Sequence, residues 1–505
     1  MSYFRKQIMQ GTSDSGSVLD VPVTPEGHLE VAIHSPRLPF GSISVESLTP
    51  VFQSDGVYGI NSGQIDTTSS LSGSCGTTFS SFVVSTGTTI YSQASIQSRK
   101  RLRYRAGQGI IGRFAGYFSQ GVTQSYQVAG FGHAEDGVYF GYKNEDFGIL
   151  YNNRGVREVR TLTITSASST NETAIVTLSG ATYGVSVTNS ANVQRTVWEI
   201  SQGTYAGWDA YPSGSTVVFV KNSVGSANNS YSISGTSLAG TFSRTKAGEA
   251  ANELFVPQSE WNGDKLDGTG ASGFTIDPTK GNVFEIGIQY LGYGTVVFKV
   301  EIVSDSNNAD FITVHTLRNP NTRTITTFGN PSYPFTMAAY SAGSTSSVSV
   351  TVGSFAGFIE GHKRLHGNRF SYFNSLTTVG ATNYQALFTI MNSRYYAGMA
   401  NQAVVNLLSV TAAVKHSNPV ILYLIKGGSL AGNPNFTQYS SNSCTLFDNT
   451  ATTVTLSTND QILWSGHLGE TGELDHILEQ EGGELTLQPG EWVTLAAKSV
   501  FGAPT

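Results

Sequence analysis

Apolar and polar residues alternate with a two-residue period along most of this chain. Clear examples are Phe114–Phe118, Val138–Tyr142 and Val296–Ile302. This period is typical of β-strands with one buried face, and turns rich in Gly, Ser and Asn separate the runs. Helical spacing is rare, and one short helix is predicted near Val197–Gln202. The pattern therefore predicts an all-β fold.

The end of the chain repeats this pattern around a turn. Leu485 and Leu487 fall on one face of a predicted strand, as do Val493 and Leu495 of the next. Between them, Pro489-Gly490 supplies a fixed φ and then a residue that accepts positive φ. We expect a C-terminal β-hairpin that serves packing rather than catalysis.

Changes in texture along the 505 residues predict several domains. Residues 1–48 hold several prolines and are expected to form an extended arm on the chain's own body or on a neighbouring subunit. Residues 49–361 are predicted to form a β-sandwich, interrupted at 160–250 by a small inserted β-rich domain. Residues 362–505 carry a further strand series that fits a jelly-roll-like sandwich.

Composition narrows the class of protein. Only 13% of residues are charged and 39% are hydrophobic, which argues against disorder. The net charge of −6 argues against nucleic acid as a partner. Cys75 and Cys444 lie far apart in the sequence and are expected to be free thiols. No apolar run has the length of a membrane span, so no membrane insertion is expected.

Three short strings imitate catalytic or metal-binding motifs. Gly107–Gly112 matches G-x-G-x-x-G, but a predicted strand follows it where a dinucleotide site needs a helix. Asp146-Phe147-Gly148 has no accompanying kinase motifs and is interpreted as a turn before a strand. His133-Ala134-Glu135-Asp136 lacks a second ligand pair and is interpreted as a solvated turn. We assign no catalytic, cofactor-binding or metal-binding residues.

Hydrolase chemistry finds no support either. It needs two carboxylates at a defined separation in a cleft, and the acidic residues here are scattered through turns. The nucleophile pattern Gly-x-Ser-x-Gly at a strand-to-helix turn is missing.

The basic run from residue 99 to 105 is the candidate interaction site. On a strand, its four arginines would project from one face, where like charges repel unless acidic groups oppose them. One interpretation is a charge seam between subunits, or a contact with phosphate or an acidic glycan. The alternative is internal pairing with acidic residues of the same domain. The residues concerned are Arg99, Arg101, Arg103 and Arg105.

Four aromatic residues leave a second question open. If they are exposed, they can stack on sugar rings, whereas their alternating positions equally suit a sandwich core. They are Tyr139, Tyr142, Tyr151 and Trp261.

Several stretches together resemble a family of virion structural proteins of tailed bacteriophages and large DNA viruses. In order along the chain they are Pro39–Gln53, Arg99–Gly109, Gly132–Gly141, Lys265–Gly270, Asp277–Gly281 and Tyr290–Gly294. The C-terminal strand pair completes the set. The resemblance implies a lectin-like, concanavalin-type sandwich for the middle block and no enzymatic activity.

From this we expect a non-enzymatic structural component of a virus particle, as a decoration, spike or tail-associated protein. It would be a homotrimer located in the virion, with other virion proteins as partners and no cofactor. The alternative is a carbohydrate-binding adhesin that recognises host surface glycans.

Overall fold

The structure is a computed structural model. It describes residues 10–12, 18–20, 48–227, 230–303, 309–322, 324–361, 367–376, 378–413, 418–458, 460–469, 472–477 and 485–501. Within these ranges the chain is almost entirely antiparallel β-sheet, so the predicted all-β, multi-domain sandwich architecture is confirmed. Apart from the short strands β1 (Gln10–Thr12) and β2 (Val18–Asp20), which pair with each other, the predicted N-terminal arm lies outside the described residues.

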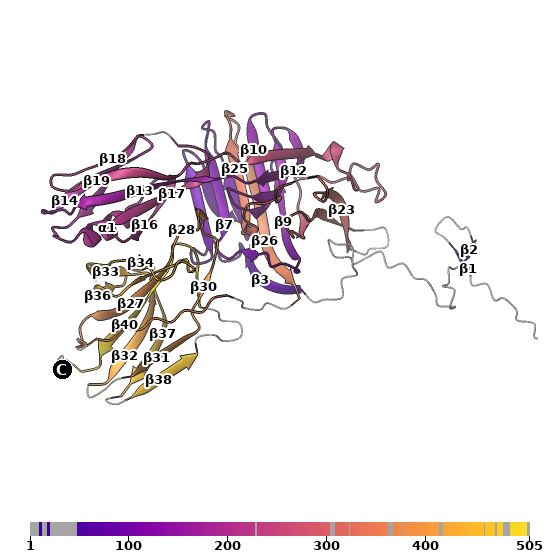
Figure 1. Ribbon diagram of the computed structural model, residues 1–505. Coiled ribbons are helices and arrows are strands. Elements are labelled where there is room, and N and C mark those ends of the chain that lie inside the picture. The colour runs from indigo at the N-terminus through magenta and orange to yellow at the C-terminus, as the bar shows by residue number, and fades with distance from the viewer. Residues whose placement is uncertain are drawn as a thin grey trace, which may run out of the picture.

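Two large sheets form the main sandwich (Figure 1). The seven-stranded sheet contains, in spatial order, β20 (Asn252–Pro257), β12 (Asp146–Asn153), β11 (Gly137–Lys143), β10 (Ser125–Gly132), β25 (Phe335–Ser341), β7 (Gln93–Ser98) and β4 (Ile65–Ser70). The opposite sheet contains β23 (Ala309–Leu317), β22 (Val296–Val303), β21 (Asn282–Ile288), β9 (Ile110–Phe118), β26 (Ser349–Glu360), β6 (Ser81–Ser85) and β5 (Ser74–Thr78), and β3 (Leu48–Asp55) also pairs with β26.

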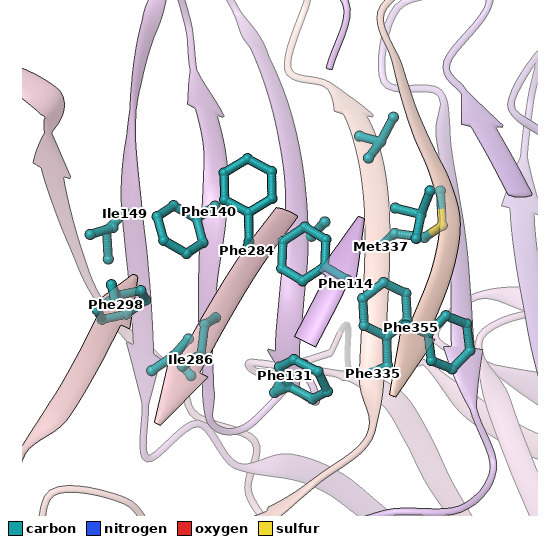
Figure 2. Packing of buried hydrophobic residues seen from close by; sticks show 14 of the residues in the cluster. Phe114, Phe131, Phe140, Ile149, Phe284, Ile286, Phe298, Phe335, Met337 and Phe355 are labelled. Atoms are coloured by element: carbon teal, nitrogen blue, oxygen red, sulfur yellow. The ribbon is translucent and has the colours of Figure 1, made fainter. Parts of the chain in front are cut away.

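Aromatic side chains from both sheets fill the space between them (Figure 2). Phe140 of β11 lies 4.7 Å from Phe284 of β21, measured between ring centroids. Phe335 of β25 stacks on Phe355 of β26 at 4.1 Å. The alternation seen in the sequence thus places one face of each strand in this shared core.

Of the four aromatic residues of the open question, Tyr142, Tyr151 and Trp261 belong to this interior, whereas Tyr139 is buried on the other face of β11. Tyr139, Tyr142, Tyr151 and Trp261 are all at most 5% exposed. Trp261 makes an edge contact with Phe140, and the Tyr151 hydroxyl donates to the Thr327 carbonyl. Stacking on sugar rings is therefore wrong for these four, because all four side chains are buried.

The inserted domain interrupts the main sandwich between β12 and β20. Its strands pair only with one another among the described residues, and they form a four-stranded and a three-stranded sheet around their own core. Its elements are β13 (Arg157–Ser166), β14 (Glu172–Leu178), β15 (Ala181–Val187), α1 (Val193–Ser201), β16 (Trp208–Ser213), β17 (Thr216–Val224), β18 (Tyr231–Ser234) and β19 (Ala239–Lys246).

Helix α1 begins four residues before the predicted start. The side chain of Asn192 accepts hydrogen bonds from the backbone N–H groups of Gln194 and Arg195, and so caps the helix. Such a cap satisfies donors that the first helical turn leaves without partners. The first turn is mostly polar, so the spacing of apolar residues does not reveal where the helix begins.

The C-terminal domain is a further antiparallel sandwich. Its largest sheet joins β33 (Ser429–Gly432), β36 (Ala451–Thr455), β27 (Tyr384–Asn392), β40 (Trp492–Ser499), β32 (Val420–Lys426), β37 (Gln461–Leu468), β34 (Thr437–Gln438) and β35 (Thr445–Asp448). Short two-stranded ladders complete it: β28 (Tyr395–Tyr396) with β29 (Met399–Ala400), β30 (Val405–Asn406) with β39 (Thr486–Leu487), and β31 (Ser409–Ala413) with β38 (Glu473–Ile477).

The expected C-terminal hairpin is wrong in its pairing. β39 and β40 do flank the Pro489-Gly490 turn, but β39 pairs with β30, whereas β40 lies between β27 and β32. The apolar faces were identified correctly, because Leu487, Val493 and Leu495 share one buried cluster. The turn instead leads the chain from one ladder to the centre of the largest sheet. The domain boundaries at 49, 160, 250, 361 and 362 stay predictions.

Candidate functional site

The inserted domain and the C-terminal domain lie side by side at one edge of the main sandwich (Figure 1). One apolar cluster contains residues of both domains, including Val218 and Val220 from one and Met391 and Ile425 from the other. Trp198 of α1 stacks on Phe436 at 5.6 Å and meets Trp492 edge-on at 5.8 Å. The two domains therefore share a core, which fixes their relative position.

A pocket of about 310 Å³ opens beside this shared core. The inserted domain contributes the end of α1, the loop after it and strand β16. The C-terminal domain contributes Met391, Arg394 and the turn before β40. The lining includes aromatic residues and residues with hydrogen-bonding groups, namely Gln202, Thr204, Tyr205, Trp208, Asp209, Tyr211, Asn222 and Trp492.

An ion pair crosses the pocket wall from one domain to the other. Arg394 Nη1 donates to Asp209 Oδ2 at 2.9 Å, and about a third of each side chain remains exposed. Gly490 sits against this guanidinium: a Cβ at that position would lie 2.4 Å from Arg394 Cζ, and the residue has a φ of +88°. The positive φ favours glycine here, and a Cβ would displace the Arg394 guanidinium, so the Pro489-Gly490 turn shapes the pocket.

The same turn meets the predicted basic run on its other side. Arg99 Nε donates to Asp66 at 2.8 Å, and its Nη1 reaches Glu491 of the C-terminal domain at 3.4 Å. Arg103 donates to the Gln402 carbonyl at 3.1 Å and to the Gln488 side chain at 3.3 Å. The contacts to Glu491, Gln402 and Gln488 join two domains of one chain, whereas Asp66 belongs to the same domain as Arg99.

The continuous strand expected for this run is wrong, because only β8 (Leu102–Arg103) is extended there, paired with β24 (Ser332–Tyr333). Leu102 is buried in the main core. The Arg105 side chain makes no hydrogen bond or ion pair with the described residues, and its backbone carbonyl accepts a turn bond from Gln108. The interpretation as a seam between subunits stays a prediction.

Arg101 differs from its neighbours in having buried guanidinium nitrogens without an acceptor among the described residues. Its Nε and Nη1 atoms are buried without a hydrogen-bond partner among the described residues. Burial lowers the pKa of Arg101 to about 10, and the nearby positive charge of Arg157 acts in the same direction. A buried guanidinium without an acceptor is costly, since desolvation is then not offset by a hydrogen bond.

The turn His133-Ala134-Glu135-Asp136 is buried, so its interpretation as a solvated turn is wrong. His133 Nδ1 lies 2.6 Å from Glu135 Oε2, and Arg157 of the inserted domain pairs with the same carboxylate. Asp136 accepts backbone N–H groups from Arg154, Gly329 and Asn330. The acidic side chains therefore hold loops together at the base of the inserted domain.

The described residues show neither a candidate metal site nor a candidate membrane-spanning helix. In these ranges no three His, Cys, Asp or Glu side chains come together to hold a metal ion. None of the helices in the described part of the chain has the length and apolarity that a membrane crossing requires. Cys75 and Cys444 are free thiols, as predicted, and both are half-buried.

No family model and no curated protein matches the sequence. Among solved structures, a legume lectin-like domain from Entamoeba histolytica is similar at a TM-score of 0.25 and 9% identity, covering 62% of this chain and 98% of that one. A lectin from Bauhinia forficata in complex with GalNAc has a TM-score of 0.22 and 7% identity, with 62% and 99% covered. The lectin UEA-II complexed with galactose has a TM-score of 0.23 and 9% identity, with 62% and 100% covered. We base the fold on the strand pairing itself.

Sequence reasoning missed the pocket. Asp209 and Arg394 are 185 residues apart, and neither belongs to a motif. Trp492 was part of the singled-out chain end, but its alternation pointed only to packing. The single usable signal was Pro489-Gly490, which marked a turn without indicating what lies against it.

Proposed function

We propose that this protein is a non-enzymatic carbohydrate-binding protein whose ligand occupies the pocket between the inserted and C-terminal domains. The observation that carries this proposal is the composition of the wall. Sugars present apolar C–H faces that pack on aromatic rings, and hydroxyl groups that pair with amides and carboxylates. Trp492, which is half-buried, supplies a ring, while Asp209 and Asn222 supply polar groups; Trp208 and Tyr211 are only 6% and 5% exposed.

Size and accessibility agree with this role. A volume of about 310 Å³ lies at the lower end of the roughly 300–1,000 Å³ found for small-molecule sites. A larger pocket of about 470 Å³ on the main sandwich fits less well. Its one aromatic residue, Tyr151, is buried and its hydroxyl is already bonded to Thr327.

The test is glycan-array binding by the full chain, followed by titration of the best saccharide against variants. Asn222→Ala removes an exposed polar group of the pocket wall, and we expect it to weaken binding about fivefold or more, the equivalent of one hydrogen bond. Asn442→Ala is the matched control, because Asn442 is equally exposed but lies outside the wall. Absence of binding to any saccharide, or equal loss in both variants, would contradict the proposal.

A structural role in a particle, as the resemblance implies, is a second candidate. It is favoured by apolar side chains exposed at loop tips of the main sandwich: Tyr58 and Phe79 are each 98% exposed. Exposed apolar side chains that lie together mark contact surfaces. The loops that carry these two touch, because a Cβ on Gly56 would meet the Ser80–Ser81 backbone. Light scattering at micromolar concentration tests the expected trimer, and a stable monomer would count against it.

A further inference from the structure

Phe79 stands at the tip of a strained turn in the main sandwich. The turn joins β5 to β6 with two residues, because Thr78 pairs with Ser81. Both turn residues have a positive φ, +44° at Phe79 and +59° at Ser80. Such a turn favours Asn and Gly, and a bulky residue there strains the backbone. Since the Phe79 side chain is almost fully exposed, packing within the described chain does not offset this strain.

The turn beside it also carries an exposed aromatic side chain. The backbone N–H of Gly59 donates to the Gly56 carbonyl at 3.3 Å, which places Val57 and Tyr58 at the tip of this turn. Both side chains are exposed, although turn tips ordinarily carry Gly, Asn, Asp or Ser. We call Gly56–Gly59 and Thr78–Ser81 the aromatic turns. Two adjacent turns that break local preference without a gain inside the molecule indicate a contact outside it.

A second feature of the main sandwich is a pocket of about 470 Å³, here called the edge pocket. It lies beside β20 and the end of β23, which are the outermost strands of the two sheets on one side. Leu254 of β20 leaves 46% of its surface exposed there. The volume is within the roughly 300–1,000 Å³ that holds small molecules, so an aromatic side chain has room to enter. The lining residues are Tyr151, Leu254, Leu317, Arg318, Asn319 and Thr322.

The aromatic turns and the edge pocket lie at opposite edges of the sandwich. β5 is the last strand of the sheet that begins with β23, and six strand spacings of about 4.8 Å separate the two, roughly 30 Å in all. One chain therefore cannot fill its own edge pocket with its own aromatic turns, whereas a second copy can. A contact between two different patches of identical subunits is heterologous, and it closes into a ring or continues as a filament.

Charge favours the same pairing. Residues 48–98 contain no Lys, Arg or His. Asp55 is exposed beside the first aromatic turn, where its carboxylate accepts the Val57 N–H at 3.0 Å. Arg318 of the edge pocket is exposed as well. Opposite charges on the two patches fix the orientation of an encounter, and the lack of cations at the turns argues against an anionic lipid surface as the partner.

We propose that the aromatic turns of one copy insert into the edge pocket of a second copy of this chain. The contact is independent of carbohydrate binding, and it supplies the subunit interface that a structural role in a particle requires. Two aromatic side chains bury roughly 150–250 Å² each, whereas each partner in a stable interface buries roughly 800 Å². A single contact is therefore weak, and a closed ring, in which every subunit makes two contacts, is favoured.

The experiment follows self-association of the full chain by sedimentation velocity over the micromolar range. The turn variant, Tyr58→Ser with Phe79→Asn, places residues that suit both turns, so it should fold at least as well as the wild type. The pocket variant is Leu254→Glu. We expect each to weaken association at least about tenfold, because aromatic anchors and the pockets that hold them carry much of the binding energy of an interface.

Phe373→Ala is the matched control, since it removes an aromatic side chain that is equally well exposed but belongs to the C-terminal domain. We expect it to associate like the wild type. Thermal unfolding of all variants separates loss of contact from loss of fold.

Crosslinking between the two variants identifies the partners. The pocket variant, with p-benzoylphenylalanine in place of Phe79, keeps a turn that can insert, and the turn variant keeps an intact edge pocket. In a mixture of the two, we expect crosslinks from position 79 of the former to the segments around 254 and 317–322 of the latter. A turn-to-turn contact would instead crosslink position 79 to residues near 58 and 79.

Different results overturn different parts of the proposal. A wild type that stays monomeric and gives no crosslink between chains refutes this contact and the trimer together. Oligomers that persist in the turn variant and in the pocket variant refute this contact and leave the trimer standing. Turn-to-turn crosslinks, or crosslinks confined to one chain, show another occupant and also refute it. None of these outcomes bears on carbohydrate binding, which the glycan array tests separately.

Discussion

At the scale of single residues, Glu135 shows how buried charge is managed in this chain. Burial by itself would raise the pKa of its carboxyl group. The positive charge of Arg157 and the contact with His133 outweigh burial and hold the pKa far below its usual range. The carboxylate therefore stays ionised inside the protein and ties the main sandwich to the first strand of the inserted domain.

Glu135→Gln should lower the free energy of unfolding by roughly 3 kcal/mol at neutral pH, because Arg157 then keeps a buried charge without its carboxylate. The pKa of Glu135 is depressed in the folded state. Its contribution to the free energy of unfolding is thus complete above the unfolded pKa of about 4.3. That contribution is lost as the pH falls toward the folded pKa. Urea unfolding at several pH values checks both points.

The wild type should lose stability more steeply than Glu135→Gln between about pH 5 and 3, because only the wild type must protonate this group on unfolding. Parallel pH profiles for the two proteins would show that folding does not lower the pKa of Glu135.

At the scale of elements, close approach of the two large sheets depends on glycine inside strands. Gly112 lies in β9 opposite β10, and a Cβ there would stand 2.1 Å from the Phe131 ring. A glycine inside a strand weakens the strand locally, but it allows the two sheets to approach each other closely. This also explains the end of the Gly107–Gly112 string: β9 begins inside it at Ile110, and the last glycine serves sheet packing within that strand.

Gly112→Ala should destabilise the protein by about 1–3 kcal/mol, because the buried Phe131 ring has to move within a packed core. Gly353→Ala in β26 is the control, since the nearest heavy atom to its Cβ would be Ser81 Oγ at 3.7 Å. Urea unfolding of the two variants should separate them. Similar stabilities would mean that the core around Phe131 can relax.

At the scale of the whole molecule, apolar contact joins the inserted and C-terminal domains, together with the Arg195 guanidinium, which donates to the Leu430 carbonyl at 2.8 Å. Trp198, Phe436 and Trp492 pack together, and the backbone N–H of Gly214 donates to the Phe436 carbonyl at 2.7 Å. Exposed ion pairs such as Arg394–Asp209 add little, because solvent and salt screen them. Shared apolar packing therefore couples the two domains and keeps the pocket between them in shape.

Phe436→Ala should cost about 3–5 kcal/mol and uncouple the two domains, because it removes the ring that stacks on Trp198. In calorimetry we expect the C-terminal domain to unfold earlier and separately. Phe373→Ala, at a position that is 87% exposed in the same domain, should leave the trace unchanged. A variant that still unfolds together with the inserted domain would place the coupling elsewhere.

The sequence alone determined the class of fold and most strand positions. A two-residue alternation is a local property, so β9, β11 and β22 could be located without knowledge of their partners. Charged and aromatic runs were harder to interpret, because alternation does not tell whether Tyr139 or Trp261 faces solvent or a second sheet. Likewise, Arg99 to Arg105 carried a charge pattern without indicating its partners.

Only the tertiary structure decided which distant segments meet. The partners of β39 and β40, the pairing of Asp209 with Arg394, and the orphaned state of Arg101 all depend on how three domains pack against one another. Such contacts join residues hundreds of positions apart, and they are selected by the fit of whole surfaces rather than by any local preference of the chain. The pocket is therefore a product of domain packing, whereas the strands around it follow from the residues themselves.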